Sequence, residues 1–215
     1  MGQAACVSER IVVAGREVVI ERPRDFEDLL TDEAFEREEL LPYWAHLWGS
    51  SVALARVVAA EVRPGMRVLE LGCGLGLPSI AAALAGANVT ASDWSADALE
   101  ATATNAKRNE VDLAVVNADW DAPAALLAGA PWELAIAADV LYEAKKVTTL
   151  LELLPRLTDH VLLAEPGRMP AEPFFDGVPE RWERTEVEGV TQPRATVHRL
   201  RLRLRPSGPE NRMDS

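Results

Sequence analysis

The residues with the clearest chemical potential form a glycine-rich loop, Gly72-Cys73-Gly74-Leu75-Gly76, directly after the apolar run Arg67–Leu71. Glycines permit a tight turn, and they let a ligand approach backbone N–H groups close to the start of a helix. Loops of this kind bind dinucleotides as well as other nucleosides, so the loop alone leaves the ligand open.

Acidic side chains accompany the loop. Glu70 lies two residues before the first glycine, where an anionic group repels a pyrophosphate and favours an ammonium or sulfonium. Asp93 ends the next apolar run, and its carboxylate can accept two hydrogen bonds from a ribose diol. The pair Asp119-Trp120 ends the third run and offers an acceptor for an adenine amino group and an aromatic face for stacking.

These features favour a cationic nucleoside over a dinucleotide. Position 77 is leucine, where the dinucleotide pattern G-x-G-x-x-G has its last glycine. S-adenosylmethionine combines a sulfonium, an amino-acid end and a neutral nucleoside, which suits acids at successive strand ends. We therefore predict S-adenosylmethionine as the cofactor. An NAD-binding oxidoreductase or a non-catalytic cofactor-binding protein is the alternative of another class.

The elements that must position these residues alternate along the chain. Strands are predicted over 67–71, 88–92, 113–117, 133–138 and 160–164, and the helices between them include 77–85, 96–109 and a segment ending near 157. Strands that alternate with helices form a parallel sheet through right-handed crossovers, with helices on both faces. The strands are continuous apolar runs, as burial on both faces requires.

Two further pairs of strands flank this core. Arg10–Ile20 is predicted to form a hairpin around Ala14-Gly15-Arg16. Arg181–Val190 and Thr196–Arg205 are predicted to form two strands joined at Gln192-Pro193. The second of these alternates leucine with arginine, so one of its faces is buried, and we expect its arginines to pair with Glu186 and Glu188.

Four stretches of the sequence resemble one enzyme family. Glu70–Gly76 resembles motif I of the seven-β-strand methyltransferases, and Asp139–Tyr142 is similar to the D-x-x-Y motif after their fourth strand. Pro42–Trp48 and Glu165–Arg168 resemble the P-Y-W-A-x-x-W and D-P-G-R segments of methyltransferase-like protein lysine methyltransferases, with Glu165 in place of Asp. The resemblance is strongest for the electron-transfer-flavoprotein β-subunit lysine methyltransferase group.

The resemblance implies a fold and a domain organisation. The expected fold class is α/β: a Rossmann-like, doubly wound, seven-stranded and mostly parallel sheet, with an antiparallel C-terminal strand and an N-terminal hairpin and helical extension. Residues 1–45 would form that extension within the same domain, and residues 46–205 the methyltransferase domain. Residues 206–215 are predicted to be a disordered tail.

The resemblance also implies site residues. Glu70, Gly72 and Gly74 would hold the methionine end of the cofactor. Asp93 would bind the ribose hydroxyls, and Trp48 would close over the cofactor. The remaining cofactor contacts would be Trp94, Asp119 and Trp120 around the adenine, and the backbone of Ala138.

Asp139 and Tyr142 are the expected catalytic residues at the entry for the acceptor amine. Methyl transfer is an in-line displacement that needs placement of the amine rather than a covalent nucleophile. We expect Asp139 to orient the amine and the Tyr142 ring to pack against a lysine stem. From the residues alone, the alternative interpretation is that Asp139 is a helix cap and Tyr142 a core residue.

The predicted activity is N-methylation of lysine side chains on a protein substrate, with the electron transfer flavoprotein β-subunit as one candidate and a small-molecule N-methyltransferase as the alternative. The net charge of −12 over 215 residues argues against nucleic-acid or membrane partners. Two cysteines and three scattered histidines argue against a metal site. We expect a monomeric cytoplasmic protein. Half of the charge excess lies in Glu21–Leu40, which is interpreted as a solvated helical segment or, alternatively, as a lid or guide for a basic substrate.

Overall fold

The computed structural model describes residues 5–25, 29–30, 41–188 and 195–203. Most of the acidic segment Glu21–Leu40, the turn at Gln192-Pro193 and the predicted tail 206–215 lie outside the described residues. No helix in the described part of the chain is both long enough and apolar enough to cross a bilayer.

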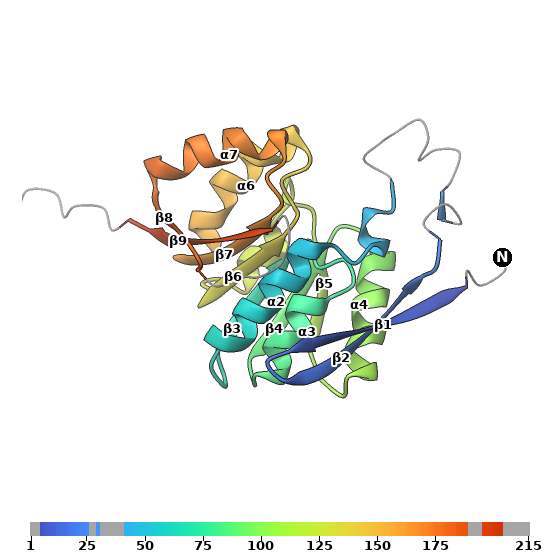
Figure 1. The fold of residues 1–215 in the computed structure, drawn as a ribbon. Helices are drawn as coiled ribbons and strands as arrows, with labels where there is room; N and C mark the ends of the chain where they lie inside the picture. The colour runs from blue at the N-terminus through green and yellow to red at the C-terminus, as the bar shows by residue number, and fades with distance from the viewer. Residues whose placement is uncertain (1–4, 26–28, 31–40, 189–194, 204–215) are drawn as a thin grey trace, which may run out of the picture.

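A seven-stranded sheet forms the centre of the molecule (Figure 1). Its strands follow the order β5-β4-β3-β6-β7-β9-β8. Their bounds are β3 Arg67–Leu71, β4 Asn88–Asp93, β5 Ala114–Asn117, β6 Leu134–Ala138, β7 His160–Glu165, β8 Trp182–Glu186 and β9 Thr196–Leu202. Strand β9 runs antiparallel to both β7 and β8, and the other neighbouring strands of this sheet pair in parallel. The predicted fold class is confirmed, including the antiparallel C-terminal strand.

Helices cover both faces of the sheet (Figure 1). One face packs against α2 (Gly49–Glu61), α3 (Leu77–Leu84) and α4 (Ala96–Arg108), and the other against α5 (Ala124–Ala128), α6 (Ala144–Leu157) and α7 (Glu172–Gly177). Short 3₁₀ turns lie at η3 (Tyr43–Ala45), η4 (Met169–Ala171) and η5 (Val178–Glu180). Alternate residues of β3 enter opposite cores, with Val68 on the α2 side and Leu69 on the α6 side.

The predicted N-terminal hairpin is present and longer than its apolar runs suggested. It comprises β1 (Cys6–Val13) and β2 (Arg16–Pro23). Asn105 of α4 and Asn109, the residue that caps its C-terminal end, attach the hairpin to the domain. Their side-chain oxygens accept hydrogen bonds from the backbone of β2, both at 2.8 Å. The hairpin thus continues the layer of helices rather than the central sheet.

The predicted pairing of Arg199 with Glu186 or Glu188 is wrong, and Arg201 lies opposite a different acid, Glu183. The register places Thr185 opposite Arg199, and Glu186 lies opposite His198. Arg199 instead donates to the carboxylate of Glu61 at the end of α2, at 2.5 Å. Strand β8 ends at Glu186, so Glu188 lies beyond the ladder. Helix packing beneath β9 therefore decides the partner of Arg199.

Candidate active site

A cavity of about 450 Å³ opens at the carboxyl ends of the parallel strands. This is the edge where ligands bind in open α/β sheets. Every residue predicted to bind the cofactor or the acceptor lines it: Trp48, Glu70, Gly72, Gly74, Asp93, Trp94, Asp119, Trp120, Ala138, Asp139 and Tyr142. Their placement in one cavity supports the predicted grouping, and their individual roles stay predictions.

The glycine loop turns from β3 into α3. Gly76 has φ +80° and caps the first turn of α3, a backbone conformation that favours glycine. Thr102 of α4 supports the loop from behind, because its hydroxyl donates to the Gly74 carbonyl at 2.9 Å. Packing and hydrogen bonds within the protein therefore fix the conformation of the loop without a ligand.

Gly76→Ala is expected to destabilise the protein. A Cβ at Gly76 would lie 2.8 Å from two atoms of Thr102, whose side chain is buried. Gly65→Ala is the matched control, since Gly65 has the same φ of +80° but a Cβ at that position would have no neighbouring atom within 4 Å. We expect Gly76→Ala to lower the free energy of unfolding by about 1–3 kcal/mol more than the control. Urea denaturation measures both, and equal losses would contradict the steric argument.

Glu70 is buried at the end of β3, with 1% of its surface exposed. Its Oε2 accepts hydrogen bonds from the backbone N–H of Ser79, at 3.0 Å, and from the Ser79 hydroxyl. Burial raises the pKa of Glu70 to about 8, although both bonds from Ser79 act in the opposite direction. Glu70 thus links β3 to α3 and also presents an ionisable group to the cavity.

The Glu70 carboxyl is expected to make stability depend on pH. Its folded pKa of about 8 exceeds the ordinary value of 4.5, so the folded state binds the proton more tightly. Its stabilising contribution is present below pH 4.5 and is lost as the pH rises towards 8, with a slope of up to about 1.4 kcal/mol per pH unit. Glu70→Gln should remove that slope. Urea denaturation at several pH values tests this, and parallel curves for both proteins would contradict it.

Asp93 joins the end of β4 to the glycine loop. Its Oδ2 accepts from the Gly74 N–H at 3.1 Å, and its Oδ1 accepts from the Ser95 N–H at 3.0 Å. Burial raises the pKa of Asp93, although these backbone N–H groups oppose the shift. The carboxylate is therefore held at the floor of the cavity by the same loop that it supports.

The far end of the cavity carries aromatic and charged groups. Asp119 follows β5 by two residues and is exposed, and its Oδ1 lies 3.0 Å from the Lys146 Nζ. The N–H of Asp121 and the ammonium of Lys146 lower the pKa of Asp119. Trp94 is half exposed and Trp120 partly buried. Rings and an ionised acceptor at one end suit a planar heterocycle with an amino group.

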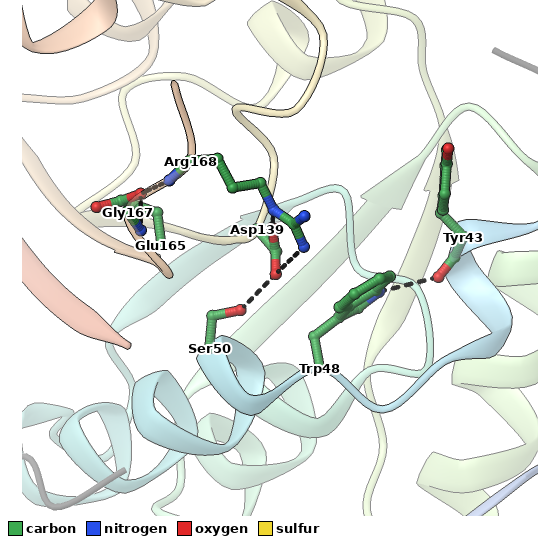
Figure 2. Close-up of polar contacts among 7 residues, drawn as sticks. All are labelled: Tyr43, Trp48, Ser50, Asp139, Glu165, Gly167 and Arg168. Atoms are coloured by element: carbon green, nitrogen blue, oxygen red, sulfur yellow. Dashed lines mark hydrogen bonds and ion pairs between the residues drawn. The ribbon is translucent and has the colours of Figure 1, made fainter. Parts of the chain in front are cut away.

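The wall opposite the strands comes from the segment before α2. The Trp48 indole N–H donates to the Tyr43 carbonyl at 3.0 Å (Figure 2). The rings of Tyr43 and Tyr142 lie 5.2 Å apart, which joins this wall to the turn after β6. Burial raises the pKa of Tyr142, and neighbouring carboxylates add to that shift, so its hydroxyl stays protonated.

Asp139 follows β6 in a left-handed conformation, with φ +56°. Aspartate is among the residues that tolerate this region. Its Oδ1 accepts from Arg168 Nε at 2.9 Å, and its Oδ2 accepts from the Ser50 hydroxyl at 3.0 Å (Figure 2). Sequence reasoning missed both partners. The segment Glu165–Arg168 was a signal for Arg168, whereas nothing marked Ser50.

The solved structures that align with this chain include methyltransferases. A 16S rRNA methyltransferase (RsmC) of T. thermophilus, solved with AdoMet and guanosine, aligns with a TM-score of 0.65 at 14% identity, over 92% of this chain and 51% of that chain. Magnesium protoporphyrin IX methyltransferase from Synechocystis, with bound SAM, has a TM-score of 0.59 at 18% identity, over 82% and 94%. The fold is therefore the Rossmann-like methyltransferase fold.

Residues 36–175 match the profile of the lysine methyltransferase family, and the chain belongs to this family. The electron transfer flavoprotein beta subunit lysine methyltransferase of Xenopus laevis is 36% identical over 137 residues, which are 59% of this chain and 53% of the relative. The Homo sapiens protein of that name is 29% identical over 149 residues, or 63% and 52%. The chain spans about half the length of the curated relatives it matches. The predicted family is confirmed.

Proposed function

We propose that this protein is an S-adenosylmethionine-dependent N-methyltransferase that methylates lysine side chains of a protein substrate. The observation that carries the proposal is one cavity with two chemically distinct ends. Acids and rings suited to a cationic nucleoside lie at the ends of β3, β4 and β5. The buried carboxylate of Asp139, after β6, lines the same cavity as the paired rings of Tyr43 and Tyr142.

The residues present fit the cofactor. A Cβ at Gly72 would lie 3.0 Å from Val140 Cγ1, so the loop passes close to the turn after β6 only because it carries glycine. Glu70 and Asp93 are buried carboxyl groups at the cavity floor, and they would hold the cationic amino-acid end and the ribose. When bound, S-adenosylmethionine would supply the methyl group and the positive charge that makes it transferable.

The acceptor side offers what a lysine needs. A lysine amine has a pKa of about 10.4 in water and must lose its proton before it can attack. Asp139 would attract the ammonium form and orient it, and the Tyr43 and Tyr142 rings would contact the aliphatic stem. Desolvation in the cavity and the positive charge of the bound cofactor would then favour the neutral amine, and its proton would leave to solvent. Placement of the nitrogen about 3–3.5 Å from the methyl carbon would supply most of the rate.

Thermal-shift titration tests the cofactor. S-adenosylmethionine at about 100 times its Kd should stabilise the folded protein by about 2.7 kcal/mol, whereas NAD at the same concentrations should not shift the melting temperature. A shift with NAD alone would support the oxidoreductase alternative and refute the proposal.

Transfer of labelled methyl groups tests the acceptor. The protein and labelled S-adenosylmethionine are incubated with whole lysate, which is then separated into protein and small-molecule fractions. We expect label in protein, recovered as methyl-lysine after hydrolysis, and purified electron transfer flavoprotein β-subunit is the first defined substrate to examine. Label in small molecules alone would favour the small-molecule alternative. The proposal further includes a monomeric, cytoplasmic protein, which light scattering and cell fractionation test.

A further inference from the structure

Arg168 contacts two residues of the acceptor wall without lining the cavity itself. Its Nε donates to Asp139 Oδ1 at 2.9 Å, and its Nη2 donates to Oδ2 at 3.4 Å. Its guanidinium carbon also lies 5.2 Å from the centre of the Trp48 ring. Figure 2 shows the guanidinium between the Asp139 carboxylate and the indole. A fork of two N–H groups fixes a carboxylate in orientation as well as in position.

Three distant segments of the chain meet at this guanidinium. Trp48 and Ser50 belong to the start of α2, Asp139 follows β6, and Arg168 follows β7. Trp48 in turn donates to the carbonyl of Tyr43, whose ring lies against the ring of Tyr142. Arg168 is therefore connected to both tyrosines through Trp48. One cation therefore organises both the carboxylate and the aromatic wall of the acceptor side.

The backbone before Arg168 is itself fixed. Glu165, with 6% of its surface exposed, accepts from the Gly167 N–H at 2.6 Å and from the Arg168 N–H at 3.3 Å. Gly167 has φ +81°, which allows the turn that aims the arginine at Asp139. The carboxylate at the end of β7 thus sets the direction of the Arg168 side chain.

The Asp139 carboxylate can accept one more hydrogen bond than it does in this structure. An ionised carboxylate has about four lone-pair sites. Three of those on Asp139 receive the Ser50 hydroxyl and the two N–H groups of Arg168. Asp139 also lines the cavity, so its carboxylate can accept one further hydrogen bond from a group bound there.

We propose that Arg168 is a positioning residue for acceptor binding, which holds the Asp139 carboxylate and the Trp48 ring in the geometry that receives the lysine ammonium. Arg168 acts through these two side chains and does not touch the acceptor. The inference rests on the proposed function, because it assigns the acceptor to the side of the cavity formed by Asp139.

A double-mutant cycle tests this inference. We expect Arg168→Gln to lower kcat/KM for the protein acceptor by about 10- to 100-fold, with the Kd for S-adenosylmethionine within about twofold of wild type. Arg168→Lys keeps the charge but loses the forked pair of N–H groups, so its kcat/KM should lie between those of Arg168→Gln and wild type. Because Arg168 acts mainly through Asp139, Arg168→Gln combined with Asp139→Asn should lie within about threefold of Asp139→Asn alone.

Arg184→Gln is the matched control. Arg184 also stacks on an aromatic ring, at 4.7 Å from the centre of Phe175, and it does not line the cavity. Its removal should leave kcat/KM unchanged. Additive losses in the double mutant, or equal losses of acceptor and cofactor affinity, would overturn the positioning role. If the wild-type protein transfers no methyl group to any protein, the proposed function is overturned as well. If the wild type is active and Arg168→Gln has the same kcat/KM, only the inference about Arg168 is overturned.

Discussion

Replacing Asp139 with asparagine is expected to lower kcat/KM for a lysine-bearing protein acceptor by about 10²- to 10³-fold, the effect of losing one partner of a desolvated charge pair. The carboxylate is buried, with 8% of its surface exposed, and it lines the cavity. Asparagine has the same shape and tolerates the φ of +56° at this position. The variant thus removes the charge and leaves the backbone in place, whereas alanine would add strain.

Two measurements separate the loss of charge from damage to the fold. The Kd for S-adenosylmethionine should stay within about threefold of wild type, because Asp139 is assigned to the acceptor rather than to the cofactor. Asp112→Asn, the same substitution at an exposed position, should leave both constants unchanged. Full activity of Asp139→Asn would show that the acceptor is oriented by other groups and that the D-x-x-Y resemblance misled the assignment.

The strand ends could be predicted because a parallel sheet brings the carboxyl ends of its strands to one edge. Glu70 and Asp93 follow from that rule, and both lie at the cavity floor. The glycine loop was predictable for a similar reason, since Gly76 must adopt a positive φ between β3 and α3. In each case, one local segment and the order of strands and helices are enough to predict where the residue lies.

Contacts between distant segments could not be predicted in the same way. Arg168 reaches Asp139 only because Glu165 and Gly167 turn the chain after β7, and the partner from α2 is a serine that no motif marks. The prediction of the partner of Arg199 failed for a similar reason. Glu61 belongs to a helix packed under β9, and strand alternation says which face is buried without saying which helix covers it.

Asp93 shows how one residue serves the fold and the predicted cofactor site together. Its two oxygens already accept from the Gly74 and Ser95 N–H groups, and each oxygen has a further lone-pair site for a hydroxyl. A ribose diol can therefore bind without breaking the bonds that shape the loop. This arrangement requires the ionised form, since a protonated carboxyl loses acceptor capacity.

Replacing Asp93 with asparagine is expected to raise the Kd for S-adenosylmethionine by about 10²-fold, because two hydrogen bonds to a charged acceptor are weakened or lost. The amide nitrogen would also face a backbone N–H donor, at Gly74 or at Ser95. Calorimetric titration measures the Kd. Asp97→Asn is the control, since Asp97 is exposed in the first turn of α4 and carries the same charge.

The pH dependence of binding gives the sharper test of Asp93. Because burial raises its pKa, the fraction that is ionised falls at a higher pH than for an ordinary aspartate. Wild-type affinity should therefore weaken as the pH is lowered through that raised pKa, and Asp93→Asn should lose this part of the dependence. Glu70 adds its own dependence near pH 8, so Glu70→Gln is titrated beside it. If wild type and Asp93→Asn show the same change in Kd with pH, Asp93 is not the ribose acceptor and acts only on the loop.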